Sequence, residues 1–322
     1  MKAAVYRGPH NIKIENVPEP IVKGRRVLVE FVVGSICGTD LHFYRGEWKL
    51  KKGRVIGHDA CAVRSDNAER VVMVPISNCG HCYFCLRGHP ALCTEANLYG
   101  LTRDGFFAQF KAMLPRNLVP VPPAMTDEEA AVVEPVALAI KVLNQMNTKL
   151  DDWVTILGQG PIGLLMTQIA QLKGCRVIAV DIQDYRLEIA KKYGAKIIIN
   201  AEKEDVPKTV RQLTKLGSDF VIEAAGVKKA VQLTPFLVRK AGKVALVGES
   251  EGYMDLEQAD EASFFTSYLS PVEYPLAVDL IARKLVNVKD LITHKFKLDD
   301  FEMALETANN PEEKPLKVIL KA

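Results

Sequence analysis

The sequence lacks a marked excess of charge of either sign. Its 42 basic and 39 acidic residues nearly cancel, which leaves a net charge of +3 over 322 residues. A surface that binds nucleic acid or an anionic membrane ordinarily carries an excess of basic side chains. We therefore expect neither nucleic acid nor membrane as a partner.

Long apolar runs are missing as well. The opening residues, MKAAVYRGPHNIKIENV, contain no run of signal-peptide length, and no later run is long enough to span a bilayer. The sequence has no Asn-x-Ser/Thr glycosylation acceptor. We expect a cytoplasmic protein. Thiols stay reduced in that compartment, so the seven cysteines favour metal binding or catalysis over disulfides.

The chain is long enough for more than one core. Hydrophobic residues make up 48% and charged residues 25%, as in globular proteins. A length of 322 residues predicts two domains. The first third is β-rich and irregular, with a strand-like run at 25–33. From Trp153 onward, strand-like runs alternate with helical stretches, which predicts a doubly wound parallel sheet of the α/β class.

A glycine-rich turn begins this alternating segment. Gly158, Gly160 and Gly163 have G-x-G-x-x-G spacing between an apolar strand and a helix. The first permits a tight turn, the second lets the backbone approach a pyrophosphate, and the third lets helix and strand pack closely. The helix N-terminus then presents free N–H groups and a positive dipole end to phosphates, and we count Pro161 and Ile162 at this turn among the cofactor-binding residues. The pattern predicts a dinucleotide site.

The end of the next strand indicates which dinucleotide binds. Asp181 follows Gly163 by eighteen residues. Its carboxylate can accept hydrogen bonds from both adenosine ribose hydroxyls and would repel a 2′-phosphate, so NAD is favoured over NADP. Arg186 is placed to stack near the adenosine.

Four cysteines, Cys79, Cys82, Cys85 and Cys93, have the spacing C-x2-C-x2-C-x7-C. Ferredoxin clusters share the first three positions but place the fourth cysteine after three residues and before a proline. Four thiolates around a tetrahedral zinc ion leave no open position. We expect a structural zinc site, with a disulfide pair or an iron–sulfur cluster as the alternatives.

Three further residues are unremarkable when taken singly. Cys37 lies in CGTDLH, His58 lies in GHD, and Glu134 precedes Pro135. The proline predicts an interruption of the helix that follows the capping box at 126–129, with an acidic side chain at the break. Spacing alone does not group these three residues.

In combination and in order, these motifs resemble the zinc-dependent medium-chain alcohol dehydrogenases, in the polyol (sorbitol) and threonine dehydrogenase branch. The resemblance covers essentially the whole chain and includes DGFFAQF, the Glu-Pro pair, and LITHKF before a terminal KVIL. It implies a GroES-like irregular β-barrel catalytic domain at 1–145, completed by 288–322, and a Rossmann NAD-binding domain at 146–287. It also implies two zinc ions per chain, one catalytic and one structural, and a homodimer or homotetramer.

The resemblance assigns roles to individual residues. Cys37 and His58 become ligands of the catalytic zinc, and Glu134 lies near or on the metal. Asp59 stands where the family usually has glutamate. Asp40 would orient His58, as partners of ligating histidines commonly do.

The resemblance also places the proton path and the cofactor. Thr39 would take the proton of the alcohol, and His42 would pass it to solvent through the nicotinamide ribose, while hydride moves to NAD. The nicotinamide end would be held by Val247, Gly248, Phe265 and Thr266.

Several functional readings stay open. The Glu-Pro pair favours a polyol, a sugar or L-threonine over simple primary alcohols, and we favour a polyol or another secondary alcohol. The CGTDLH motif, with Tyr44 and Trp48 following it, resembles the corresponding segment of threonine dehydrogenases. Asp181 and the retained cysteines argue against a zinc-free quinone reductase that uses NADPH. A catalytically silent NAD-binding relative, suggested by Asp59, predicts a filled cysteine lobe and an empty Cys37 site.

Overall fold

The structure is a computed structural model that describes residues 1–248, 254–267, 269 and 271–322. It divides into two compact units, unit 1 (Met1–Ala137 with Leu269–Ala322) and unit 2 (Leu138–Tyr268). The sequence-based limits of two independent domains, 1–145 with 288–322 and 146–287, stay a prediction. Within the described residues, no helix combines the length and the apolar character that crossing a bilayer requires.

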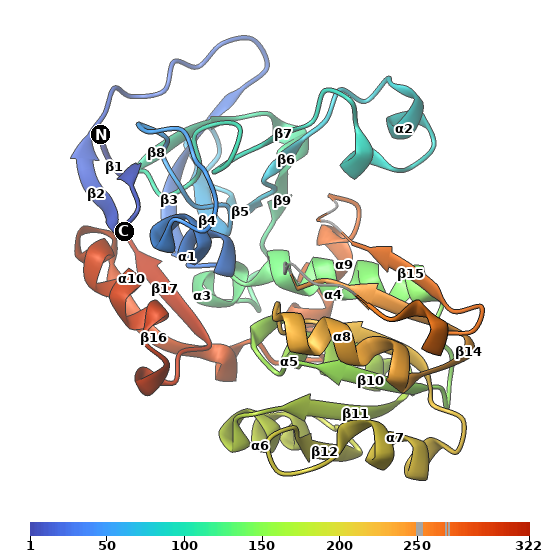
Figure 1. The fold of residues 1–322 in the computed structure, drawn as a ribbon. Coiled ribbons are helices and arrows are strands. Elements are labelled where there is room, and N and C mark those ends of the chain that lie inside the picture. The colour runs from blue at the N-terminus through green and yellow to red at the C-terminus, as the bar shows by residue number, and fades with distance from the viewer. Residues whose placement is uncertain (249–253, 268, 270) are drawn as a thin grey trace. The chain divides into compact units, whose positions relative to one another are not determined.

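Unit 1 is built on a largely antiparallel sheet of seven strands (Figure 1). The strands follow the order β16-β17-β3-β4-β5-β9, and β8 also pairs with β3. Their bounds are β3 (Val27–Ser35), β4 (Ala60–Arg64), β5 (Arg70–Met73), β8 (Phe110–Met113), β9 (Leu118–Pro120), β16 (Ile292–Lys297) and β17 (Lys317–Lys321). Two small sheets pair β1 (Lys2–Gly8) with β2 (Asn11–Asn16), and β6 (Ile76–Ser77) with β7 (Asn97–Leu98). The β-rich first third and the final strand are as predicted.

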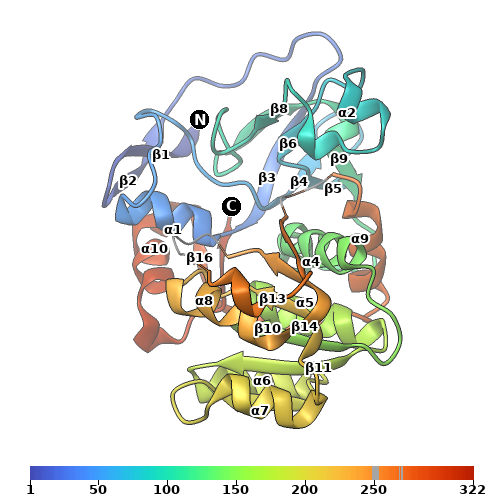
Figure 2. The same cartoon turned by 45° about the vertical axis from the view of Figure 1, so that its right-hand side comes forward.

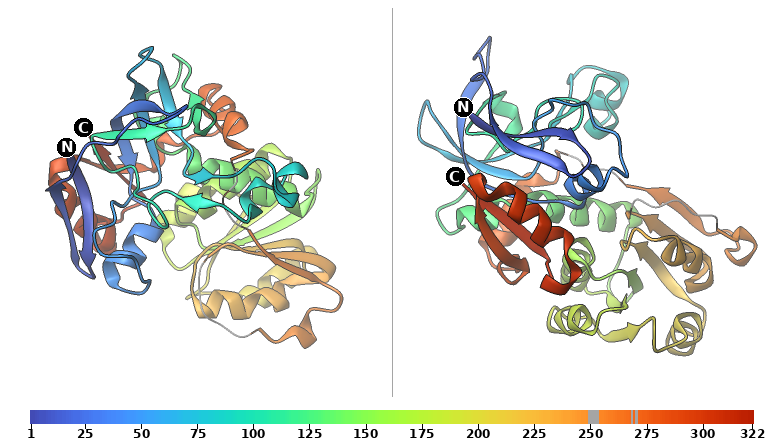
Figure 3. Two further views of the ribbon diagram at one scale, coloured as in Figure 1. Left: turned by 90° about the horizontal axis from the view of Figure 1, so that it is seen from above. Right: turned by 60° about the vertical axis from the view of Figure 1, so that its left-hand side comes forward.

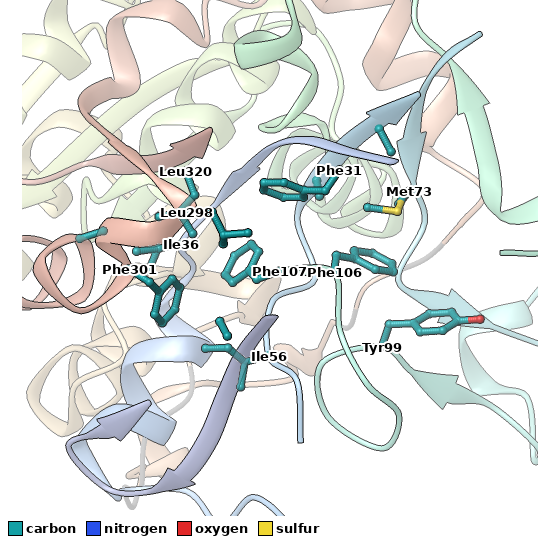
Figure 4. Packing of buried hydrophobic residues seen from close by; sticks show 14 of the residues in the cluster. Phe31, Ile36, Ile56, Met73, Tyr99, Phe106, Phe107, Leu298, Phe301 and Leu320 are labelled. Carbon is teal, nitrogen blue, oxygen red and sulfur yellow. The ribbon is translucent and has the colours of Figure 1, made fainter. Parts of the chain in front are cut away.

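Aromatic side chains from distant parts of the sequence pack together within the core of unit 1 (Figure 4). The ring of Phe107 contacts that of Phe31 at a centroid distance of 6.4 Å and that of Phe301 at 5.8 Å. All three rings are buried, which removes them from water and stabilises the unit. Because Phe301 begins α10 (Phe301–Asn309), the C-terminal segment is part of the same core as β3.

The helices of unit 1 include α1 (Gly38–Arg45), α2 (Tyr83–Leu86), α3 (Asp127–Ala130) and α9 (Tyr274–Ala282); α4 (Val133–Met146) begins in this unit. The capping box of Thr126 and Glu129 forms at the start of α3, as predicted. The predicted interruption at Pro135 is wrong. The chain turns at Ala131 and Val132, and Pro135 lies in the first turn of α4, where its missing N–H costs no hydrogen bond.

Unit 2 contains a parallel sheet of six strands in the order β12-β11-β10-β13-β14-β15. The strands are β10 (Trp153–Leu157), β11 (Arg176–Asp181), β12 (Ile197–Asn200), β13 (Ser218–Glu223), β14 (Val238–Leu246) and β15 (Ser263–Thr266). Right-handed connections place α5 (Pro161–Leu172) and α6 (Asp184–Lys192) on one face, and α7 (Val206–Thr214) and α8 (Lys228–Leu237) on the other (Figures 2 and 3). The predicted doubly wound sheet is confirmed. The edge strand β15 was not predicted.

Gly163 gives a direct test of how unit 2 packs. A Cβ on Gly163 would lie 1.8 Å from the carbonyl oxygen of Gly158, whereas a Cβ on Gly160 would meet no described atom within 4 Å. We expect Gly163→Ala to lower the free energy of unfolding by about 2 kcal/mol or more, because the backbone must move. Gly160→Ala should cost less than about 1 kcal/mol. Urea unfolding of both variants measures the difference, and equal costs would contradict this packing.

Candidate active site and metal centres

Unit 1 brings together three of the predicted zinc ligands. One ligand atom from each of Cys37, His58 and Asp59 lies within 4.8 Å of the other two. Cys37 follows the end of β3, and His58 and Asp59 precede β4, which pairs with β3 in antiparallel register. The backbone N–H of Ser35 donates to the carbonyl oxygen of Asp59 at 2.9 Å. The pairing of the two strands therefore makes neighbours of residues that are apart in the sequence.

Gly57 gives the backbone the conformation that it needs directly before His58. Its φ is +92°, a left-handed conformation that side chains rarely adopt, and a Cβ there would lie 2.4 Å from Cγ of Phe107. The aromatic core thus packs directly against the backbone that precedes His58. The positive φ and the contact with Phe107 therefore explain why glycine occupies this position of the GHD motif.

Asp59 is buried and bound on one side by a lysine that the sequence analysis did not identify. Lys317 Nζ donates to Asp59 Oδ2 at 3.1 Å and to Ser35 Oγ at 3.1 Å, and Ser35 Oγ donates to the same carboxylate oxygen at 3.3 Å. Burial alone lowers the pKa of Lys317, but the charge of Asp59 holds this pKa above its usual value. The signal in the sequence was a single lysine within the otherwise apolar run LKVIL, because a buried lysine requires a partner.

The second oxygen of the Asp59 carboxylate is not engaged by Lys317 or Ser35. Asp59 Oδ1 has no hydrogen-bond partner among the described residues and lies 3.8 Å from His58 Nε2. His58 Nδ1 is likewise buried without a partner in the described part of the chain. Burial lowers the pKa of His58, yet Asp59 and Cys37 together hold it well above the usual value. The unpaired Oδ1 of Asp59, beside the thiol and the imidazole, fits a bound cation.

Glu134 adds a further buried carboxyl group. It lies in the first turn of α4, and burial followed by the negative charge of Asp59 raises its pKa to about 8. It is not part of the three-residue donor set found among the described residues. The phenol of Tyr274 is fully buried, and its hydroxyl has no partner within the described residues. Burial, with the charges of Glu134 and Asp59, raises the pKa of Tyr274 well above its usual value.

Asp40 makes a different contact from the predicted one. Its carboxylate Oδ2 accepts the backbone N–H of Cys37 at 2.9 Å, because Cys37 is the N-cap residue of α1 and Asp40 is its third helical residue. Among the described residues, no hydrogen bond joins Asp40 to His58. Asp40 therefore holds the backbone at Cys37, and its role in orienting His58 stays a prediction.

Thr39 and His42 lie three residues apart in α1, on one face of the helix. Both are partly exposed. The imidazole of His42 forms a hydrogen bond through Nδ1 with Glu47 and stacks on the ring of Trp48. Glu47 belongs to none of the sequence motifs that predicted the site.

The four cysteines of the lobe form a closed cluster around α2, the helix labelled in Figure 1. The sulfur atoms of Cys79, Cys82, Cys85 and Cys93 all lie within 4.8 Å of one another, and none of the seven cysteines, all described, forms a disulfide. Backbone N–H groups of Cys79 and Cys82 each donate to a cysteine sulfur at 3.3 Å. Backbone N–H groups of Cys85 and Thr94 lower the pKa of Cys82 to about 6. Such donors favour thiolates, so the residues fit a zinc ion with no open position.

The glycine loop of unit 2 has the geometry that a pyrophosphate requires. Gly158 has a φ of +89°, and Gly160 is the N-cap residue of α5, so the N-cap itself offers no side chain to the first N–H groups. Pro161 and Ile162 are the first two residues of the helix. Uncapped N–H groups at the N-terminus of a twelve-residue helix attract an anion.

Asp181 lies next to this loop, at the end of β11. Its carboxylate accepts the backbone N–H of Gln159 at 2.6 Å and that of Gln183 at 2.9 Å, and each oxygen keeps a lone pair. Arg186 Nη1 is 4.0 Å from Asp181 Oδ2, and Arg186 Nε donates to the hydroxyl of Tyr185 at 2.9 Å.

The residues predicted to hold the nicotinamide end belong to β15 or follow β14. In the strand order these two strands lie on the opposite side of β10 from β11, which carries Asp181. The N–H groups of Val247 and Gly248 donate to the carbonyl oxygen of Glu223 at 2.8 and 3.0 Å. Phe265 and Thr266 belong to β15, where they pair with Ala245 and Leu246 of β14. The structure therefore brings Val247 and Gly248 close to the end of β13, and it places the other two residues on the edge strand.

Comparison with known proteins identifies the family. Residues 23–123 match the alcohol dehydrogenase GroES-like domain, and residues 161–283 match the zinc-binding dehydrogenase domain. The chain is 30% identical to the sorbitol dehydrogenase of Bacillus subtilis (strain 168) over 341 residues, which cover 99% of this chain and 97% of that protein. The chain belongs to the zinc-dependent medium-chain alcohol dehydrogenase family.

Two further relatives extend the comparison of this dehydrogenase. It is 30% identical to the L-threonine 3-dehydrogenase of Bacillus licheniformis, with 95% of each chain covered. Its fold is similar to that of the alcohol dehydrogenase RspB of Escherichia coli CFT073, solved in complex with NADH, with a TM-score of 0.92, 29% identity, and 100% of this chain and 99% of that chain covered. The predicted fold class and the prediction of an oxidoreductase that acts on alcohols or polyols are confirmed.

The Lys317–Asp59 pair leads to a stability prediction. Lys317→Met removes the cation that donates to Oδ2 of the buried Asp59 carboxylate, so we expect a loss of about 3–5 kcal/mol in the free energy of unfolding. The double variant Lys317→Met/Asp59→Asn should lose clearly less, because it removes both charges.

Lys321 provides the matched control on the same strand. It pairs with Glu128 at 2.6 Å but its side chain is 47% exposed, so Lys321→Met should cost less than about 1 kcal/mol. Urea unfolding of metal-free protein measures all three variants. Equal losses in Lys317→Met and Lys321→Met would contradict the buried pair.

Proposed function

We propose that this dehydrogenase oxidises a secondary alcohol, with a polyol or sugar as the favoured substrate, and uses zinc and NAD. The observation that carries the proposal is the set of Cys37, His58 and Asp59, whose ligand atoms converge within 4.8 Å. A thiolate, an imidazole and a carboxylate are typical zinc ligands, and three protein ligands with an open fourth position are typical of catalytic zinc. Asp59 Oδ1, a buried atom without a hydrogen-bond partner within the described residues, supports this assignment.

Two zinc ions are part of the proposal. Cys37 and His58 would hold the catalytic ion together with Oδ1 of Asp59, since Oδ2 is occupied by Lys317 and Ser35. Glu134 would stand near or on this ion. Cys79, Cys82, Cys85 and Cys93 would hold the structural ion. When bound, the catalytic zinc would act as a Lewis acid that lowers the pKa of an alcohol hydroxyl, and NAD would accept the hydride.

The residues of the chain itself would bind the cofactor and move the proton. The α5 N-terminus at Gly160 would bind the pyrophosphate, and Asp181 would accept hydrogen bonds from the adenosine ribose. Arg186 would lie by the adenosine; Val247, Gly248, Phe265 and Thr266 would hold the nicotinamide end. Thr39 Oγ1 would accept the proton of the substrate hydroxyl, and His42 would release it to solvent.

The choice of substrate is supported by the relatives. The sorbitol dehydrogenases of Bacillus subtilis and Halalkalibacterium halodurans share 30% and 28% identity with this chain. L-Threonine is the second candidate, because the L-threonine 3-dehydrogenase of Bacillus licheniformis also shares 30%. The CGTDLH motif followed by Tyr44 and Trp48 supports this second candidate. The homodimer or homotetramer and the cytoplasmic location belong to the same proposal.

A substrate panel tests this function. Zinc-loaded protein is mixed with NAD and with polyols, aldoses, L-threonine or simple secondary alcohols, and NADH formation is followed by absorbance. We expect a rate with polyols or sugars. Cys37→Ser should abolish this rate and remove one of two zinc ions per chain, because it takes a ligand from the open site.

Cys175 is the matched control for Cys37. It is buried in unit 2, and its thiol donates to the carbonyl oxygen of Lys149 at 3.5 Å, a bond that serine can keep. Cys175→Ser should retain both zinc ions and the rate. Tight NAD binding with no rate on any substrate would support the catalytically silent relative and overturn the proposal. A rate on L-threonine alone would favour the second candidate.

Asp181 yields a prediction about cofactor choice. Asp181→Asn keeps an oxygen that accepts the N–H of Gln159 or Gln183 but removes the charge that repels a 2′-phosphate. We expect the ratio of kcat/KM for NAD to that for NADP to fall at least about tenfold, which corresponds to about 1.4 kcal/mol. Steady-state kinetics with both cofactors measures the ratio. An unchanged ratio would contradict the role of Asp181.

A further inference from the structure

The imidazole of His42 is held on two sides by residues that follow α1. Its Nδ1 is hydrogen-bonded to Oε2 of Glu47. Its ring stacks on the ring of Trp48, with centroids 4.4 Å apart and planes at 15°. One contact is at the edge of the imidazole and the other is on its face, so together they restrict both the position and the plane of the ring.

The local backbone builds this arrangement. Gly46, with a φ of +76°, ends α1, and the N–H groups of Glu47 and Trp48 both donate to the carbonyl oxygen of His42, at 3.0 and 3.3 Å. The turn thus folds both side chains back over the residue that they contact. Trp48 also packs against Phe43 at a centroid distance of 5.9 Å, at the margin of the unit 1 core. The turn that carries Glu47 and Trp48 is therefore held in place by backbone hydrogen bonds and by packing.

Arg45, the neighbouring arginine, contacts the other oxygen of Glu47 and not Oε2. Arg45 Nη1 is 3.8 Å from Glu47 Oε1, and Arg45 Nε donates to Asn309 at 2.6 Å. The side chains of His42 and Glu47 are 27% and 46% exposed. A pair with this exposure contributes at most about 1 kcal/mol to folding. The contribution of the His42–Glu47 pair to the stability of the fold is therefore small.

The hydrogen bond also determines which nitrogen of His42 carries the proton. An ionised carboxylate only accepts hydrogen bonds, so Nδ1 must donate to Glu47. In the neutral ring, Nε2 is then the nitrogen with the free lone pair. A terminal proton acceptor needs this lone pair.

We propose that Glu47 is a positioning residue for His42, which fixes the Nδ1–H tautomer and leaves Nε2 as the proton acceptor. The proposal rests on the role of His42 in the proposed function. A proton that arrives at Nε2 forms an imidazolium, which the carboxylate of Glu47 and the face of Trp48 stabilise until Nε2 releases the proton to solvent. Nδ1 keeps its proton throughout, and no other group is consumed.

The test compares Glu47→Ala and Glu47→Gln in the zinc-loaded enzyme with NAD bound. ¹⁵N NMR of histidine-labelled protein reports the tautomer of His42, with His42→Asn identifying its signals. We expect Nδ1–H in the wild type, a shift toward Nε2–H in Glu47→Ala, and retention of Nδ1–H in Glu47→Gln, whose amide oxygen still accepts. The kcat should fall about tenfold in Glu47→Ala, part of the effect of a positioned base, and recover in part in Glu47→Gln. KM for NAD and zinc content should not change.

Glu15 is the matched control, because it forms an exposed ion pair with Arg7 at 2.5 Å in the same unit. Glu15→Ala should leave both the tautomer and kcat unchanged. An unchanged His42 tautomer in Glu47→Ala would overturn the proposal, as would an equal loss of kcat in Glu15→Ala. If the wild type reduced no NAD, the tautomer change would still uphold the positioning of His42, and only the proposed function would fall.

Discussion

Lys317 supplies the positive charge that allows a group of acids to be buried in unit 1. Asp40, Asp59 and Glu134 are each less than a tenth exposed, and Lys317 Nζ binds Asp59 at 3.1 Å. Burial of several carboxyl groups is costly unless cations or hydrogen bonds compensate for it. Asp40 is compensated by the N–H of Cys37, whereas one oxygen of Asp59 has no partner among the described residues. The remaining negative charge favours a bound cation, and the thiol and imidazole beside it favour zinc.

The architecture explains why this charge gathers at one place. The pairing of β3 with β4 joins Cys37 to His58 and Asp59, and the pairing of β17 with β3 brings in Lys317. The C-terminal segment is therefore needed to complete the site and not only the core. The site in unit 2 depends on close backbone contact. Gly158 and Gly163 permit this contact and so shape the loop and the helix N-terminus for a pyrophosphate.

The sequence predicted the features that depend on local patterns. The glycine loop, the strands of the parallel sheet and the four-cysteine spacing each lie within a short stretch, so their chemistry is visible without a fold. Spacing alone did not group Cys37 with His58; only the family resemblance did. The Lys317–Asp59 contact joins residues 258 positions apart, and no periodicity indicates it. The edge strand β15 was missed because four residues on a partly exposed edge give no clear alternation. The helix break was misplaced because a proline in a first turn looks like one that interrupts a helix.

Anomalous scattering at the zinc edge, from crystals grown with zinc and NAD, would locate the metal ions. We expect two peaks in each chain: one beside Cys37 Sγ and His58, and the other among the four sulfur atoms of the cysteine lobe. A single peak in the cysteine lobe, with nothing beside Cys37 in fully zinc-loaded protein, would contradict this expectation.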